Sequence, residues 1–138
     1  MKDFELLKER LSAHRTLGSA PQTEIEWIAR NGKLRHLDPG AVLTSKDGQV
    51  EGLHIVLDGH LTIYVDRGAG QRKIMEWRGG DVTGLLPYSR LVAPPGDVVA
   101  EEASEVVTVD RNHIPEMIRE CPEVTATLVH VMLDRARH

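Results

Sequence analysis

Residues 53–65 read LHIVLDGHLTIYV, and this stretch is the strongest fold signal in the chain. Two short runs rich in apolar and β-branched residues are separated by Asp58-Gly59. Runs of this length around a turn dipeptide are typical of two β-strands joined by a tight turn. Asp-Gly favours a hairpin turn in which both central residues take a positive φ. The sequence therefore predicts an antiparallel hairpin of strands 53–57 and 61–65.

Similar short runs continue on both sides of this segment, and glycine, proline and aspartate separate them. The further strands that we expect span residues 34–36, 41–44, 73–77, 98–100 and 105–109. Many short strands with turn residues at each end favour an antiparallel barrel or sandwich. The predicted fold class is therefore mainly β, an antiparallel β-roll with helices at both ends.

Helical periodicity replaces the strand pattern at both ends of the chain, where apolar residues recur on one helical face. The expected helices span residues 2–15, 21–29, 112–119 and 123–137. We therefore divide the chain into N-terminal helices (1–33), the β-roll (34–109) and C-terminal helices (110–138). The length of 138 residues is that of one ordinary domain.

The last predicted helix carries a narrow stripe of Val124, Leu128, Val131 and Arg135. A stripe of this width suits a seam between two helices. We expect it to pack against the roll or against the same helix of a second chain. The second arrangement would form a homodimer through the C-terminal helix.

Composition excludes several classes of protein. The net charge of −4 is the wrong sign for a surface that binds nucleic acid. No apolar run approaches the roughly 20 residues of a membrane span. The single cysteine, Cys121, cannot form an internal disulfide, and we expect a structural thiol in a cytoplasmic protein.

Four segments, taken in order, resemble landmarks of one family. They are residues 37–43, 53–61, 77–84 and 105–109. Together they resemble the cyclic-nucleotide-binding domain family, whose β-roll is of the catabolite activator protein type. The resemblance covers about Leu34 to Arg137. It implies a double-stranded β-helix, or jelly roll, with a phosphate-binding cassette at about residues 80–100.

The cassette departs from the family pattern, which is Gly-Glu-Leu-Gly followed by Arg-Ser/Thr-Ala. In the family, the Glu accepts a hydrogen bond from the ribose 2′-hydroxyl, and the Arg pairs with the cyclic phosphate. In this chain Leu85 stands at the Glu position, and Pro94-Pro95-Gly96 replaces Arg-Ser-Ala. We therefore expect weak or absent binding of a cyclic nucleotide (cAMP or cGMP) or of another small anion.

The backbone near the cassette offers a second way to bind an anion. The backbone amides of Gly84, Leu85 and Leu86 precede Pro87, which is expected to open a short helix through Tyr88 and Ser89. A helix N-terminus presents unpaired amides and a positive dipole to a phosphate or carboxylate. Arg90 either reaches this site or is a solvated residue of a surface loop. The candidate ligand-binding residues are Gly84, Leu85, Leu86, Tyr88, Ser89 and Arg90.

Residues 81–90 and 119–130 are also similar to N-terminal sensor domains of certain bacterial histidine kinases. This resemblance implies that the last helix controls a downstream kinase module. The expected function is thus that of a non-catalytic regulatory sensor with no enzyme activity of its own.

Two alternatives remain open. A cupin-type barrel enzyme would need a metal triad, but the seven histidines include no His-x-His pair. His54 and His60 flank the predicted hairpin turn, and we expect them to be strand-surface residues rather than metal ligands. The other alternative is a pure dimerisation domain that binds no ligand.

Overall fold

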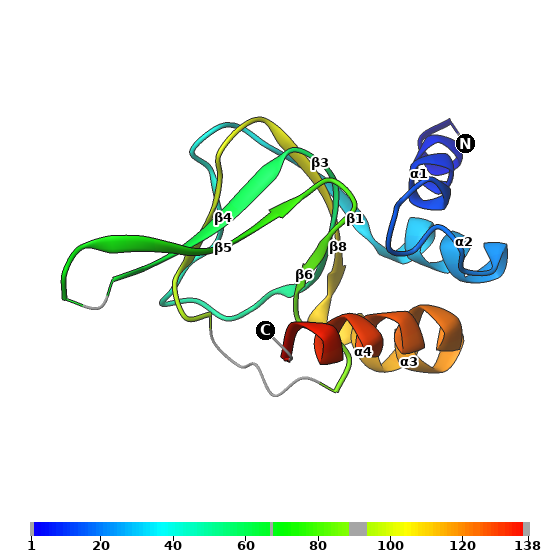
Figure 1. Ribbon diagram of the computed structural model, residues 1–138. Coiled ribbons are helices and arrows are strands. Elements are labelled where there is room, and N and C mark those ends of the chain that lie inside the picture. Colours follow the sequence, from blue (N-terminus) through cyan, green and yellow to red (C-terminus); the bar gives the residue numbers. More distant parts are fainter. Residues whose placement is uncertain (1, 67, 89–93, 137–138) are drawn as a thin grey trace.

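Two four-stranded antiparallel sheets form a β-roll in the computed structural model, which describes residues 2–66, 68–88 and 94–136 (Figure 1). The strand order is β1-β8-β3-β6 in one sheet and β2-β7-β4-β5 in the other. The predicted antiparallel roll is confirmed. The strands are β1 (Lys33–Leu37), β2 (Val42–Thr44), β3 (Gly52–Asp58), β4 (His60–Asp66), β5 (Gln71–Arg78), β6 (Val82–Gly84), β7 (Asp97–Ala100) and β8 (Ser104–Asp110).

The predicted hairpin between residues 53–57 and 61–65 is wrong, because β3 and β4 lie in different sheets. β3 pairs with β8 and β6, whereas β4 pairs with β5 and β7. His54 therefore lies opposite Thr83 and Thr108, while His60 lies opposite Arg78. The Asp58-Gly59 turn carries the chain from one sheet to the other, and the two histidines are not cross-strand neighbours.

The turn itself needs only one residue with a positive φ. Gly59 has φ +108°, and Asp58 is not in the left-handed region. A Cβ at Gly59 would lie 2.1 Å from the Ser104 Oγ, which accepts a hydrogen bond from the amide of His60. Glycine is required here both by the backbone conformation and by the close approach of β8.

β3 is buried on both faces because it is a central strand covered by helices on one side. Leu53 and Ile55 belong to the apolar cluster that includes the helices. Val56 belongs to the second cluster, which lies between the two sheets. Side chains alternate between the faces of a strand, so His54 points with Val56 toward the interior of the roll.

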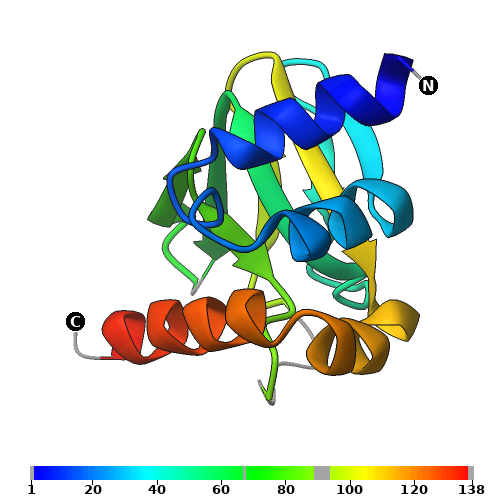
Figure 2. The ribbon, with the colours of Figure 1, turned by 90° about the vertical axis from the view of Figure 1, so that its right-hand side faces the viewer.

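The helices gather on one face of the β1-β8-β3-β6 sheet (Figure 2). They are α1 (Lys2–Ser12), α2 (Gln22–Asn31), α3 (Ile114–Glu120) and α4 (Pro122–Ala136), and η1 (Arg111–His113) is a 3₁₀ turn. α1 ends earlier than predicted because the chain turns inward at His14, whose Nε2 lies 3.0 Å from the Val56 carbonyl oxygen. The helix predicted at 112–119 begins as the 3₁₀ turn η1, where Asp110 accepts a hydrogen bond from the Asn112 amide.

The apolar stripe of α4 packs within the chain. Val124 and Leu128 are fully buried in the same cluster as Ile55 and Val107, and Val131 packs against it. Of the two arrangements predicted for this stripe, contact with the roll is the one that the structure shows. A homodimer through α4 stays a prediction.

A buried carboxylate joins α2 to the start of α4. Glu24 accepts hydrogen bonds from the backbone amides of Glu123 and Val124, at 3.3 Å and 2.8 Å. These amides belong to the first turn of α4, whose N–H groups have no partner within the helix. The negative charge also interacts favourably with the positive end of the helix dipole.

Replacement of Glu24 with alanine should therefore lower the free energy of unfolding by about 2 kcal/mol, because the buried amide of Val124 and the partly buried amide of Glu123 lose their acceptor. Urea denaturation followed by circular dichroism measures this change. Glu26→Ala is the matched control on the same helix: its half-exposed carboxylate pairs with Lys8 and Arg30, and its loss should cost about 0.5 kcal/mol or less. Equal losses in the two variants would contradict the capping role.

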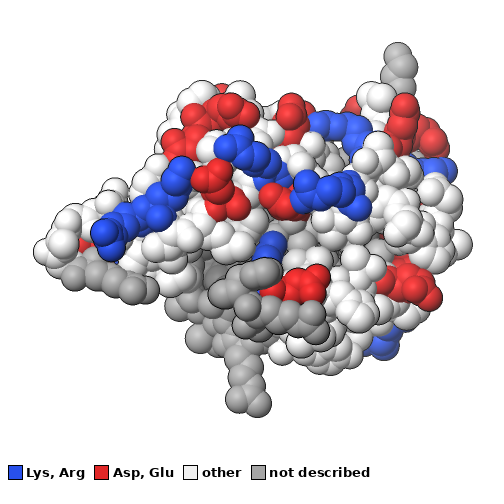
Figure 3. All heavy atoms as spheres, in the orientation of Figure 1, with Lys and Arg blue, Asp and Glu red and all other residues white. Residues whose placement is uncertain are grey.

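The surface mixes both signs of charge. On the face shown in Figure 3, basic side chains alternate with acidic ones and form no continuous basic patch. On β5, Glu76 forms ion pairs with Lys73 and Arg78. In the described part of the chain, no helix has the length and apolar character needed to cross a membrane.

Candidate functional site

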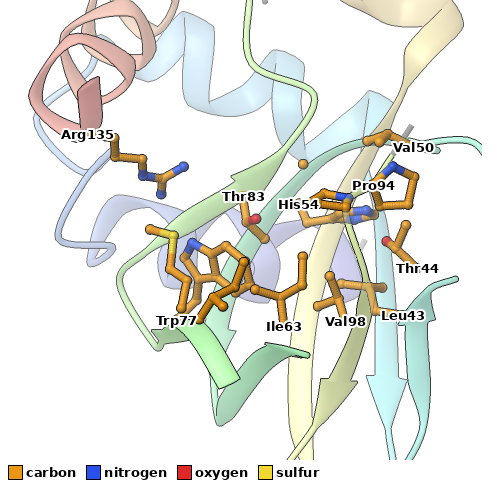
Figure 4. Close-up of a pocket in the computed structure, with 14 residues that line it drawn as sticks. Leu43, Thr44, Val50, His54, Ile63, Trp77, Thr83, Pro94, Val98 and Arg135 are labelled. Carbon is orange, nitrogen blue, oxygen red and sulfur yellow. The ribbon is translucent and has the colours of Figure 1, made fainter. Parts of the chain in front are cut away.

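A cavity of about 220 Å³ lies between the two sheets of the roll and the end of α4 (Figure 4). Its walls are mostly apolar and include Ile63, Trp77 and Val98 from the second sheet. His54 and Thr83 come from the first sheet, and Figure 4 shows Arg135 entering from α4. The other lining residues are Leu43, Thr44, Val50, Ile74, Met75, Gly84, Pro94 and Pro95.

His54 is the most deeply buried polar group in the wall. Its side chain is 1% exposed, and its Nδ1 lies 2.9 Å from the Thr108 Oγ1. Its Nε2 has no hydrogen-bond partner among the described residues. Burial lowers the pKa of His54 to about 4, with a smaller contribution from the charge of Arg35. The expectation of a strand-surface histidine is wrong, because both faces of β3 are covered.

Trp77 supplies a second polar group to the same space. It is buried, and its Nε1, like the His54 Nε2, lacks a hydrogen-bond partner among the described residues. Indole and imidazole N–H groups usually have a partner when buried. Both side chains line the cavity, and these two buried nitrogen atoms have no hydrogen-bond partner among the described residues.

Arg135 brings a positive charge to the mouth of the cavity. Its guanidinium donates a hydrogen bond to the Val82 carbonyl oxygen in β6. Burial lowers the pKa of Arg135, while Asp81 acts in the opposite direction. The sequence placed Arg135 on the apolar stripe of the last helix, and that position was the only signal of its inward direction. A long Arg side chain can follow an apolar stripe and still carry its charge to a polar site.

Gly84 lies against His54 at the end of β6, a short strand that the sequence analysis did not identify. Its φ is +89°, and a Cβ there would lie 2.4 Å from the Gly52 carbonyl oxygen and 2.8 Å from the His54 ring. Only glycine leaves room for the imidazole at this point. Of the predicted ligand-binding residues that the structure describes, Gly84 is the one that lines the cavity.

The remaining predicted residues lie elsewhere. The amide of Leu85 donates to the Gly52 carbonyl, and Leu86 is buried in the cluster beneath the helices. Tyr88 is 71% exposed and has φ +64°, so the short helix predicted to pass through it does not form. Ser89 and Arg90 lie outside the described residues. The Leu85 N–H is therefore not free to bind an anion at the predicted site.

The structure shows where the residues that replace the family's cassette residues lie. Pro94 and Pro95, which replace the Arg-Ser pair of the family, line the cavity. Leu85, at the family's Glu position, packs against the apolar cluster instead. Among the described lining residues there is one cation, Arg135, and no carboxylate.

Two other kinds of chemistry find little support in the described residues. No three His, Cys, Asp or Glu side chains there gather as metal ligands. Burial raises the pKa of the Cys121 thiol to about 12. A thiol held in its protonated form is a poor nucleophile, which fits a structural role.

Comparison with known families identifies the class of protein. The model of the cyclic nucleotide-binding domain family matches residues 34–121. The match covers more than half of the chain, and the chain belongs to this family.

Known relatives are distant. Lysophospholipase NTE1 of Coccidioides immitis (strain RS) is 25% identical over 115 residues, which are 83% of this chain and 7% of that protein. The regulatory subunit of a cAMP-independent protein kinase A from Trypanosoma cruzi, bound to guanosine, has a TM-score of 0.80 at 20% identity, over 99% of this chain and 47% of that one. The catabolite activator protein of Thermus thermophilus has a TM-score of 0.75 at 21% identity, over 87% and 56%. The chain thus spans a small part of the first protein and about half of the other two.

Proposed function

We propose that this domain is a non-catalytic regulatory sensor, in which a small ligand enters the cavity of the roll and α4 reports its presence. The observation that carries the proposal is the position of Arg135. This residue belongs to α4 and also lines the cavity beside strands of both sheets. A ligand that contacts Arg135 would stabilise one position of α4 relative to others. A ligand controls a protein only through such differential contacts.

Contacts along α4 support this role. Leu128 anchors the middle of the helix in the core, and Glu24 holds its first turn. Arg135 in the last turn is bonded to the β6 backbone at Val82. A change at the cavity would therefore act on the C-terminal turn of a helix that is fixed at its other end. We also propose that α4 controls a downstream effector. The resemblance suggests that this effector is a histidine kinase module.

Cyclic AMP should bind weakly, with a dissociation constant above about 10 μM, because the cavity lacks the two polar side chains of the family pattern. Isothermal titration calorimetry measures this constant. Pro94→Arg, which returns a cation to the position of the family Arg, should raise the affinity by about tenfold. A sub-micromolar constant for the parent protein would refute the proposed absence of conventional nucleotide binding.

The sensor function can be tested with a panel of three probes: cyclic AMP, guanosine and hexanoate, which is a small monocarboxylate with an apolar body. Any probe that changes the fluorescence of Trp77 should also change amide hydrogen exchange in the last turns of α4. The protection of β3 serves as the internal reference, since this strand is central and buried. Binding that leaves the exchange of α4 unchanged would show that the helix does not report occupancy.

A further inference from the structure

The cavity combines apolar walls with buried nitrogen groups that lack a hydrogen-bond partner among the described residues. The His54 Nε2 and the Trp77 Nε1 are buried without a partner among the described residues. A buried polar group without a hydrogen bond costs free energy that a bound molecule can recover. The chemical character of these groups therefore indicates the character of the ligand.

The Trp77 Nε1 is always a donor, and the hydroxyl of Thr108 decides the role of the His54 Nε2. The hydroxyl hydrogen of Thr108 has no acceptor in the described part of the chain other than the His54 Nδ1, at 2.9 Å. If it donates to Nδ1, the imidazole proton lies on Nε2. The opposite tautomer would leave this buried hydroxyl without an acceptor. The Nε2 is thus an N–H donor, on a side chain that lines the cavity.

No carboxylate of the described residues forms an ion pair with Arg135. Its one described hydrogen bond goes to a neutral carbonyl, at Val82. Asp81 acts on the charge of Arg135, but its carboxylate forms an ion pair with Arg15. A partly buried cation is stabilised when an anion pairs with it. All three nitrogen groups therefore favour a ligand that accepts hydrogen bonds and carries negative charge.

The walls limit the rest of the ligand to an apolar body. Ile63, Val98 and Leu43 offer no hydrogen bonds, and Thr44 and Thr83 are the remaining polar side chains. The volume of about 220 Å³ lies below the roughly 300–1,000 Å³ that is common for drug-sized ligands. A small molecule with one charged end and a hydrocarbon body matches this shape.

We propose that the cavity binds a small apolar monocarboxylate, with its carboxylate on Arg135 and on the N–H groups of the wall. The hydrocarbon part lies against Ile63 and Val98. This proposal rests on the proposed sensor function and names the ligand class of the same cavity.

Hexanoate and its neutral counterpart hexanamide test the charge requirement. In a Trp27→Phe background, Trp77 is the only tryptophan and reports directly on the cavity. Hexanoate should change the Trp77 emission and should bind at least about tenfold more tightly than hexanamide in calorimetry. Inorganic phosphate, which has charge but no apolar body, should bind more weakly than hexanoate.

Substitutions assign the effect to Arg135. Arg135→Gln should remove the preference for hexanoate, a loss of about tenfold in affinity, and leave hexanamide binding unchanged. Arg135→Lys should keep part of the preference, because the charge remains. Arg119→Gln is the matched control, since Arg119 is an exposed cation on α3 and should have no effect.

The outcomes separate the two proposals. Equal binding of hexanoate and hexanamide, or a preference that survives Arg135→Gln, would overturn the monocarboxylate class and leave the sensor function standing. Selective hexanoate binding without any change in α4 exchange would support the ligand class and overturn the sensor function. Failure of every probe, including cyclic AMP and guanosine, would overturn both.

Discussion

Replacement of Leu128 with aspartate should lower the free energy of unfolding by about 4 kcal/mol or more, the largest effect that we expect from one substitution. Leu128 is 0% exposed in the cluster between α4 and the first sheet. The variant loses the apolar contacts of the leucine and buries a carboxylate with no described partner nearby. The result should be detachment of α4, because the cluster between the two sheets does not include this residue.

Leu133→Asp is the matched control, since Leu133 lies on the same helix and is 52% exposed. It should change stability by no more than about 0.5 kcal/mol. Hydrogen exchange across residues 122–136 and across β4 shows whether the helix loosens while the roll remains folded. A Leu128→Asp protein with parental protection in α4 would show that the helix is not held by this face.

Acidification should destabilise the domain through His54, by about 2 kcal/mol between pH 7 and pH 5. Burial lowers the pKa of this histidine in the folded state from its ordinary value of 6.5 to about 4. Well above pH 6.5 both states are neutral at this position. As the pH falls below 6.5, the unfolded chain binds a proton that the folded chain does not bind, and unfolding becomes more favourable.

His54→Gln should remove this contribution, because glutamine does not titrate. Urea denaturation of parent and variant at pH 7, 6 and 5 measures the difference in slope. The difference isolates His54 from His14, whose pKa is also lowered by burial and which acts in the same direction. An NMR titration that finds the His54 imidazole half-protonated above pH 6 in the folded protein would contradict this prediction.

Local sequence patterns predicted most of the elements but not their partners. Seven of the strands fall on runs with period-two alternation or turn punctuation, and the four helices fall on helical periodicity. Asp58-Gly59 favoured a hairpin because turn chemistry is local. The pairing of β3 with β8 joins segments that are distant in sequence, and no property of residues 53–65 specifies that partner.

The cavity was harder to predict than the fold. The sequence identified the missing family residues at Leu85 and Pro94, because these depend on alignment alone. It did not place Arg135 in the cavity, since this contact joins the last helix to a strand distant in sequence. The sequence did contain a signal for the burial of His54. This histidine lies inside an otherwise apolar run, and such a run is typical of a strand that is covered on both faces. Such a residue is buried rather than exposed.

The position of β8 between β1 and β3 has a consequence for how the chain folds. Lys33 pairs with Thr108, and Ile55 pairs with Val107, so β1 has no partner and β3 has only β6 until the segment at 104–110 is available. Topologies dominated by such distant pairings pay the entropy of loop closure first and fold slowly. Until β8 inserts, β3 presents one unpaired edge of an apolar strand. This interval is when newly made chains are most exposed to aggregation.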